Sequence, residues 1–248
     1  MKAIILAGGK GARLAPHTNI LPKPLIPIGD MPILEVMLRQ LRAYGFTEVV
    51  LCIGYLGDLL EAYFGDGSKY DLAITYSREA EPLGTAGPLG IAPGLDQTFF
   101  AMNGDLLTTL NFAEMLRFHR SHGRPVTVGL ADKAVNIDLG VIRSTKDHVL
   151  EEYIEKPTYN YKVSMGVYIF EPSVLPLIRD AGRLDLPDLI RQLISTGQKP
   201  MTFDSQCRWL DMGRIEDYRL AVETFEADRN IYLPAAVSAS VADEEASQ

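Results

Sequence analysis

Two spacings of apolar residues alternate through the first half of this chain. Short continuous apolar runs, the length of buried strands, occupy residues 3–7, 48–53, 72–76, 99–102 and 125–131. Between them, apolar residues recur at helical intervals over residues 33–44, 56–64 and 112–122. This strand–helix–strand order predicts a mainly parallel sheet with helices on both faces.

Signals at the ends of the expected helices agree with this pattern. Asn111, with Glu114 three residues later, is close to a capping box, and Gly123 marks the end of the same helix. Pro32 stands near the start of the helix over residues 33–44, and Gly45 follows its end.

The second half has a different rhythm. Three short strands without long helices between them are expected at residues 140–143, 149–154 and 163–170. They predict a small antiparallel or mixed addition that covers one end of the sheet. The remaining expected elements are helices over 173–179, 185–195 and 215–226 and a strand near Met201. We expect one domain over residues 1–230 and a disordered tail over 231–248, since the residues after Pro234 are small and acidic.

Composition narrows the class of protein. The chain has 248 residues, 47% of them hydrophobic, which is enough for a sizeable core. Its net charge of −8 makes it a poor candidate for nucleic-acid binding. Two cysteines outside any C-x-x-C pattern favour a reducing cytoplasm, and no apolar run approaches the roughly 20 residues of a membrane span. We expect a cytoplasmic protein without a signal segment or membrane contact.

A glycine-rich loop follows the first apolar run. Gly8, Gly9 and Gly11 allow the backbone to approach an anion closely, and Arg13 adds a charged fork suited to phosphate oxygens. Ten residues on, Lys23 lies between two prolines that restrict the backbone around it. The loop and its two cations predict a polyphosphate site, with a tight surface turn as the alternative.

Two familiar glycine-rich patterns do not fit this loop. The dinucleotide pattern G-x-G-x-x-G requires a glycine where Leu14 stands. The P-loop pattern ends in Gly-Lys-Ser/Thr, and no such run occurs.

A carboxylate follows another expected strand. Asp105, in Asn103-Gly104-Asp105, comes just after the run at residues 99–102, where open α/β sheets bind ligands. An Asx turn is the alternative. Together with the glycine loop this position favours a Mg²⁺ ligand, and we expect Gly104 to leave room for a phosphate or metal. His119 and His122 have no third ligand, so we interpret them as surface residues.

The loop G-G-x-G-x-R-L followed by P-K-P resembles the signature of the sugar-1-phosphate nucleotidyltransferases, and the resemblance spans residues 1 to about 230. It implies a Rossmann-like, doubly wound fold and a reaction of a nucleoside triphosphate with a sugar 1-phosphate. It also implies that Asp105 and Asp211, the latter in W-L-D-M-G, bind Mg²⁺. The nucleotide-binding residues it implies are Leu6, Ala7, Gly8, Gly9, Gly11, Arg13, Lys23, Gly84, Thr85, Asn103, Gly104 and Asp105.

The same resemblance assigns the sugar phosphate. The E-K-P motif places Glu155 on sugar hydroxyls and Lys156 on the sugar phosphate, although an exposed charge pair at a strand end is the alternative. Gly140, Ser164, Gly166 and Tyr168 would line the sugar pocket. The implied catalytic set is Arg13, Lys23, Asp105, Lys156 and Asp211. No general base is required, because a phosphomonoester with a second pKa near about 6 is already dianionic.

The chain departs from the family pattern at several positions. Ala12 replaces a common Thr, which affects side-chain hydrogen bonds of the loop but not its backbone. Ser164 replaces a usual Asn and Leu139 a usual Tyr, and both changes bear on which sugar fits. The stretch from Glu81 to Leu89 most resembles guanylyltransferases for mannose- or heptose-type sugars, with uridylyl- and thymidylyltransferases as alternatives. A non-catalytic sensor and a transferase for a non-sugar phosphate also remain open. We expect a monomer or small homo-oligomer.

Overall fold

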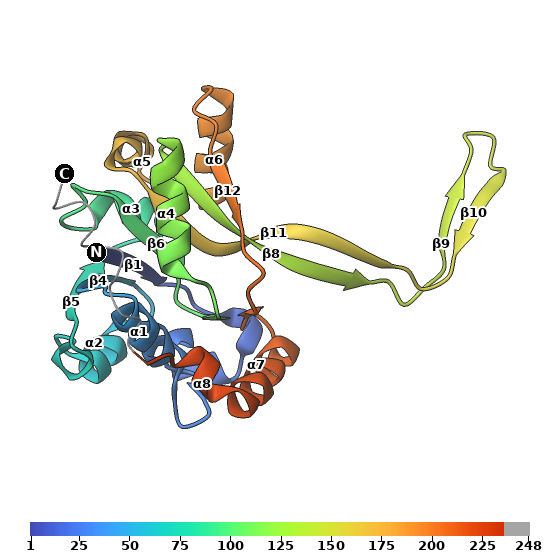
Figure 1. Cartoon of the computed structure of the whole chain (residues 1–248). Helices are drawn as coiled ribbons and strands as arrows, with labels where there is room; N and C mark the ends of the chain where they lie inside the picture. The colour runs from blue at the N-terminus through green and yellow to red at the C-terminus, as the bar shows by residue number, and fades with distance from the viewer. Residues whose placement is uncertain (236–248) are drawn as a thin grey trace.

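The computed structural model describes residues 1–235, and residues 236–248 of the expected tail lie outside them. A seven-stranded sheet forms the centre, in the order β12-β8-β11-β6-β1-β4-β5 (Figure 1). Only β11 runs antiparallel to its neighbours. The strands are β1 (Lys2–Ala7), β4 (Glu48–Ile53), β5 (Ala73–Arg78), β6 (Phe99–Asn103), β8 (Val126–Asn136), β11 (Thr158–Phe170) and β12 (Met201–Asp204).

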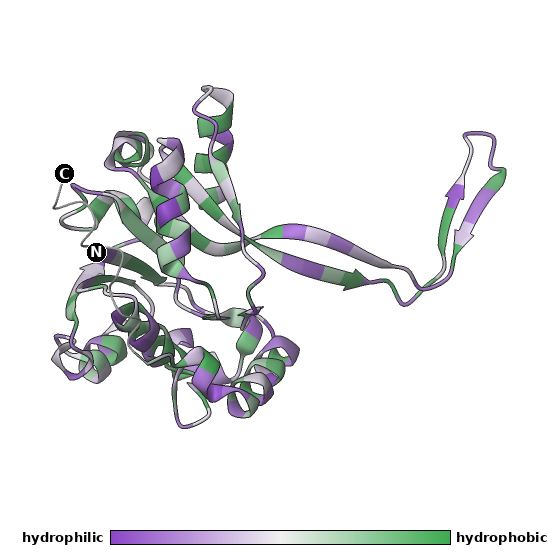
Figure 2. Cartoon of the chain, in the orientation of Figure 1, coloured by the Kyte–Doolittle hydropathy of each residue, from purple (hydrophilic) through white to green (hydrophobic). Residues whose placement is uncertain are grey.

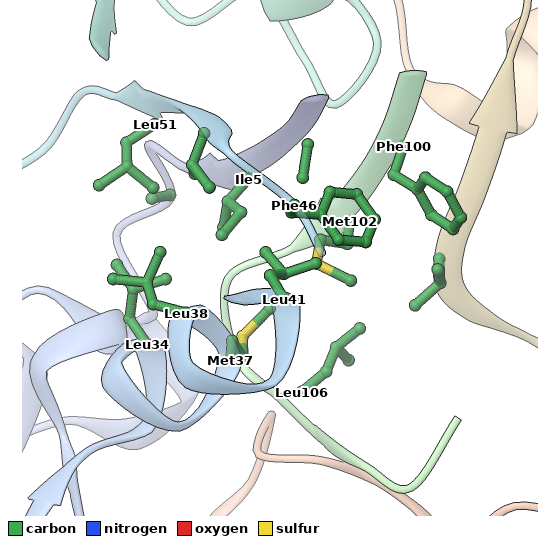
Figure 3. Packing of buried hydrophobic residues seen from close by; sticks show 14 of the residues in the cluster. Ile5, Leu34, Met37, Leu38, Leu41, Phe46, Leu51, Phe100, Met102 and Leu106 are labelled. Carbon is green, nitrogen blue, oxygen red and sulfur yellow. The ribbon is translucent and has the colours of Figure 1, made fainter. Parts of the chain in front are cut away.

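Helices cover both faces of this sheet. One face packs against α1 (Ile33–Ala43), α2 (Gly57–Phe64) and α4 (Phe112–His122), and the other against α3 (Gly87–Ile91), α5 (Leu175–Ala181) and α6 (Leu186–Ser195). Figure 3 shows leucines of α1 packed beside Ile5 of β1 and Leu51 of β4. Ile4, which points the other way, packs in the opposite layer. The predicted Rossmann-like, doubly wound fold is confirmed.

A third apolar cluster closes the end of the sheet beside the loop that follows β1. It joins α7 (Ile215–Ala227) and α8 (Arg229–Tyr232) to two short pairs, β2 (Pro27–Ile28) with β3 (Met31–Pro32) and β7 (Leu106–Thr108) with β13 (Trp209–Asp211). Tyr232 is fully buried in this cluster. The packed chain therefore continues beyond residue 230, where the sequence interpretation set the domain boundary.

The antiparallel addition differs from its prediction. Beyond the sheet, β8 and β11 continue as a two-stranded ribbon that ends in the hairpin of β9 (Val141–Ser144) and β10 (Leu150–Ile154) (Figure 1). The ribbon projects away from the sheet instead of covering its end. Paired β residues continue from Ala131↔Val163 to Asn136↔Thr158, so the strands have no break at which to fold back.

The interpretation of His119 as a surface residue is wrong. Its ring is 2% exposed, with Nδ1 2.7 Å from Thr127 Oγ1 and Nε2 3.0 Å from Glu171 Oε1. A buried histidine needs partners for both ring nitrogens, and β8 and the end of β11 supply them. His122 lies 2.9 Å from the same Thr127 oxygen, and burial lowers its pKa.

No helix among residues 1–235 is long and apolar enough to cross a membrane.

Gln40 offers a test of how α1 is fixed to the end of the fold. Its buried side-chain amide donates to the carbonyl oxygens of Thr108, at 2.8 Å, and Tyr232, at 2.9 Å. Gln40→Met keeps the volume but removes the donor, so the free energy of unfolding should fall by about 1–3 kcal/mol. Urea denaturation measures this, with the exposed Gln198→Met as the control. Equal stability of the two variants would contradict the role of Gln40.

Candidate active site

The carboxyl ends of β1 and β6 meet at a hollow of about 770 Å³. Parallel strands present ligand-binding residues at this edge. All twelve residues predicted to bind the nucleotide line the hollow: Leu6, Ala7, Gly8, Gly9, Gly11, Arg13, Lys23, Gly84, Thr85, Asn103, Gly104 and Asp105. We call it the nucleotide hollow, and its size suits a nucleotide-sized ligand.

The glycines of the opening loop are required by the backbone and its neighbours. Gly11 has φ +61°, a left-handed conformation that favours glycine, and its carbonyl accepts a 2.9 Å hydrogen bond from Thr18. A side chain at Gly8 would strike the carboxylate of Glu79. The loop therefore passes close to two other segments and leaves its own face toward the hollow.

Three charged side chains form a cluster at one side of the nucleotide hollow. Lys23 makes an ion pair with Asp105, and its Nζ lies 3.8 Å from Oδ1 of Asp211. Burial raises the pKa of Asp211, the nearby charge of Asp105 raises it further, and Lys23 and Arg13 oppose this. Lys23 is thus the cation that offsets the repulsion between two carboxylates.

The pairing of β13 with β7 explains how Asp211 reaches this cluster. Asp211 is opposite Leu106, the residue after Asp105, and the N–H of Met212 donates to the carbonyl of Asp105 at 3.2 Å. Trp209, on the same strand, donates from its indole N–H to Met165 of β11 at 2.8 Å. These two hydrogen bonds, both accepted by main-chain carbonyls, therefore place the second carboxylate beside the first.

The pair of carboxylates fits a hard cation that completes its shell with substrate. Among residues 1–235 no group of three or more His, Cys, Asp or Glu side chains converges on one point. Mg²⁺ is commonly held by one or two carboxylates together with substrate phosphates, so Asp105 and Asp211 suit it. A closed zinc site would need more protein ligands than these two.

A second hollow, of about 790 Å³, adjoins the first and shares Arg13 and Asn103 with it. Three of the predicted sugar-pocket residues, Ser164, Gly166 and Tyr168, line it, as does Asp211. Ser164 and Tyr168 hydroxyls lie 2.8 Å apart, and burial raises the pKa of Tyr168. Gly166, at φ +76°, admits the side chain of Asn103, which would meet any Cβ there. We call this the second hollow.

Three predicted sugar-phosphate residues are not brought to either hollow. Gly140, Glu155 and Lys156 lie on the projecting ribbon, beyond the last strand residues that line the second hollow. Gly140 instead packs against the ring of Tyr153 on the neighbouring strand. Within one chain, the cluster at the hollows consists of Arg13, Lys23, Asp105 and Asp211.

Two glycines at the nucleotide hollow serve packing. A Cβ on Gly104 would lie 3.0 Å from the carbonyl oxygen of Leu6, so the absent side chain allows close strand contact, not space for a phosphate as the sequence suggested. A Cβ on Gly84, which has φ +82°, would lie 2.5 Å from the carbonyl oxygen of Leu184, so this glycine also allows close packing.

Thr85 connects the nucleotide hollow to helix α6. Its hydroxyl accepts a 2.8 Å hydrogen bond from the N–H of Leu186, the first residue of that helix, and its own N–H donates to Asp185 at 2.9 Å. The loop that lines the hollow is therefore tied directly to the start of α6.

Sequence reasoning missed several residues at the hollows. Glu79 lines the nucleotide hollow and accepts a 3.0 Å hydrogen bond from the N–H of Leu83. Lys133, 3.9 Å from Asp217, and Arg214 line the second hollow. Glu79 follows the strand expected at residues 72–76, and this position after a strand end could have marked it as a candidate. Lys133 had none, because the sequence interpretation ended its strand at residue 131.

Comparison with known proteins agrees with this geometry. The family model described as nucleotidyl transferase matches residues 2–228. A UTP–glucose-1-phosphate uridylyltransferase of Synechocystis sp. is 33% identical over 244 residues, covering 90% of this chain and 62% of that protein. A mannose-1-phosphate guanyltransferase of Schizosaccharomyces pombe is 34% identical over 227 residues, covering 88% and 62%. The chain thus spans about three-fifths of the length of these relatives.

The fold is also that of a solved structure, HddC from Yersinia pseudotuberculosis. It superposes with a TM-score of 0.69 at 22% identity and covers 90% of this chain and 99% of that one. The chain belongs to the nucleotidyl transferase family, as its glycine loop and paired carboxylates indicated.

The raised pKa of Asp211 gives a test of the cluster. The fold disfavours its ionised form, so Asp211→Asn should raise the Tm at pH 7, on the order of 2 °C. As pH falls through the raised pKa, wild-type Asp211 becomes protonated and the difference should shrink. Differential scanning calorimetry across pH checks this, with the exposed Asp96→Asn as the control. A lower Tm for Asp211→Asn at pH 7 would show that the charge of Asp211 stabilises the fold.

Proposed function

We propose that this chain is a Mg²⁺-dependent sugar-1-phosphate nucleotidyltransferase that converts a nucleoside triphosphate and a sugar 1-phosphate into a nucleoside-diphosphate sugar and pyrophosphate. The observation that carries the proposal is the pair of adjoining hollows with a shared wall, where Arg13, Lys23, Asp105 and Asp211 converge. Two anionic substrates that react with each other need two such spaces and cations between them.

The residues present would act mainly by positioning and by neutralising charge. The glycine loop offers backbone N–H groups to the triphosphate, and Arg13 and Lys23 offer cations. The second hollow would hold the sugar, with the sugar phosphate, already a dianion, attacking the α-phosphorus in line and pyrophosphate leaving. No side chain has to remove a proton.

The triphosphate also changes the partner of Lys23. In the protein alone Lys23 is paired with Asp105. Asp105 and Asp211 would hold Mg²⁺, whose two positive charges would offset the two carboxylates or part of the triphosphate charge. Lys23 is then available to the triphosphate oxygens, so the same side chain stabilises the free site and binds the substrate.

Guanine is our first choice of base, with a mannose- or heptose-type sugar. Glu79 and Glu81 line the nucleotide hollow, and an ionised carboxylate only accepts hydrogen bonds. Guanine presents two adjacent donors, its ring N–H and its amino group, whereas uracil presents one donor between two acceptors. Several relatives named as mannose-1-phosphate guanylyltransferases support the same choice. The alternatives are uridylyl or thymidylyl transfer, or a non-catalytic sensor of nucleotide or sugar phosphate.

The proposed function is tested by pyrophosphate release from four nucleoside triphosphates against a panel of sugar 1-phosphates with Mg²⁺. Turnover with any pair supports a transferase. Faster turnover with GTP than with ITP, an additional nucleotide that lacks the amino group, supports recognition of guanine by hydrogen-bond acceptors. Binding of a nucleotide without turnover of any pair identifies a sensor. Activity without a sugar phosphate would contradict the proposed reaction.

Lys23→Ala tests the role of the cation between the carboxylates. We expect kcat/KM for the triphosphate to fall about 100-fold with the fold retained, because one charge at the reacting phosphates is lost. Steady-state kinetics with circular dichroism measure both. Lys10→Ala, in the same loop and also lining the nucleotide hollow, is the comparison, and equal loss in the two variants would mean that general charge, not the position of Lys23, matters.

Asp105→Asn and Asp211→Asn test whether the two carboxylates act as one Mg²⁺ site. Each should lower turnover about 1,000-fold, and the double variant should be little worse, since groups that act as a unit are non-additive. Turnover is followed across a Mg²⁺ titration. Multiplicative losses in the double variant would instead show two independent roles.

A further inference from the structure

The projecting ribbon, residues 132–162, lines the second hollow only at its base, through Lys133, Ala134 and Val135. We call it the arm. It contains the outer parts of β8 and β11 and the whole β9–β10 hairpin. At its base Lys133 lies 3.9 Å from Asp217 of α7, and beyond this point the arm stands clear of the helices (Figure 1). In the central sheet β8 and β11 pair with other strands as well, but β9 and β10 pair only with each other. A lone two-stranded ribbon is marginally stable in water.

The arm exposes apolar side chains along its length. Leu139 is 73% exposed and Val149 60%, and hydrophobic residues alternate with hydrophilic ones out to the tip (Figure 2). The exposed large apolar residues of the arm are Val135, Leu139, Ile142, Val149, Leu150, Tyr153 and Tyr161. Exposed apolar residues gathered on one element mark a contact surface.

The bend of the arm, residues 155–157, carries a strained backbone. Lys156 has φ +44°, although the residue before a proline strongly prefers an extended conformation. The bend is fixed by a 3.0 Å hydrogen bond from the N–H of Ile137 to the carbonyl of Pro157. Among residues 1–235 neither Glu155 nor Lys156 forms an ion pair. Such strain in non-glycine residues is concentrated at functional sites.

The bend does not reach the second hollow of its own chain. The hollow extends along the ribbon as far as Val135, which is opposite Tyr159, and residues 155–157 lie beyond this point and line neither hollow. The paired residues between Asn136↔Thr158 and Leu130↔Ser164 keep this stretch straight. Folding the bend back onto its own hollow would break that ladder.

We propose that the arm exchanges with a second copy of this chain, so that residues 155–157 of each protomer complete the second hollow of the other. The proposal rests on the proposed function, which leaves the sugar phosphate without the cation Lys156 inside one chain. Glu216 and Arg214 line the second hollow, form no ion pair among residues 1–235, and are complementary in charge to Lys156 and Glu155. In a dimer with two-fold symmetry, the same contact would cover the exposed apolar side chains of both arms.

Mixed dimers test the exchange directly. A chain with Asp105→Asn keeps a working arm but has a disabled hollow, and a chain with Lys156→Ala has the reverse. Co-expressed with different tags and purified through both, they form a dimer with one complete site. Exchange predicts about half of the wild-type turnover from this dimer, whereas each homodimer is nearly inactive. An inactive mixed dimer, or no dimer at all, overturns the proposal.

A disulfide cross-link shows, without relying on activity, whether the arm at each second hollow comes from the same chain or from a second copy. With Cys207→Ser, the pair Lys156→Cys and Glu216→Cys should form a disulfide between two chains, seen as a dimer on a non-reducing gel. A disulfide within one chain, or none, overturns exchange. If the wild type shows no turnover with any substrate pair, the proposed function fails while this readout still decides whether the arms exchange.

Analytical ultracentrifugation tests the contact made by the arm, with a matched surface variant as the control. Leu139→Ser with Leu150→Ser should convert a wild-type dimer to a monomer, because both apolar contacts lie on the arm. Ile194→Ser, on α6 and 60% exposed, removes an equally exposed apolar residue elsewhere and should leave the mass unchanged. A monomeric wild type at micromolar concentration, or a dimer in both variants, contradicts an interface made by the arm.

Discussion

The close approach of two carboxylates is the constraint on which the rest of this site depends. Asp105 and Asp211 come from segments about a hundred residues apart and are held together by the pairing of β13 with β7. Partial burial raises the pKa of Asp211, and the charge of Asp105 raises it further. Such an arrangement persists only where a cation stands between the groups, and Lys23 supplies it in the protein alone. These three side chains are held in place by the parallel strands, the glycine loop and the third apolar cluster.

The sequence predicted the parts of this structure that depend on local pattern. The strand at residues 48–53 and the cap at Asn111, whose side chain accepts from the N–H of Glu114 at 3.1 Å, are present as expected. The gathering of these residues at one hollow was also predictable, because they follow strand ends in short motifs. Twelve residues placed there by motif all line one hollow.

The parts that depend on tertiary partners could not be predicted in the same way. His119 is spaced like a surface residue of α4, and only the folded positions of Thr127 and Glu171 explain its burial. The short strands β7 and β13 have too few residues for a periodic signal, yet they carry the second carboxylate to the first. The sequence interpretation missed the outer half of β11 because most of its side chains are exposed and show no buried face. The E-K-P motif, which precedes this strand, was therefore expected at a hollow that it does not reach within its own chain.

The hydrogen bond between Thr85 and the start of α6 has a consequence for motion. The amide of Leu186 is shielded from solvent only while the loop that lines the nucleotide hollow holds its place. Opening of that loop and fraying of the helix are therefore one event, with one free energy. A ligand that fills the hollow slows hydrogen exchange at the first turn of α6, so occupancy can be followed at the amide of Leu186, which does not line the hollow.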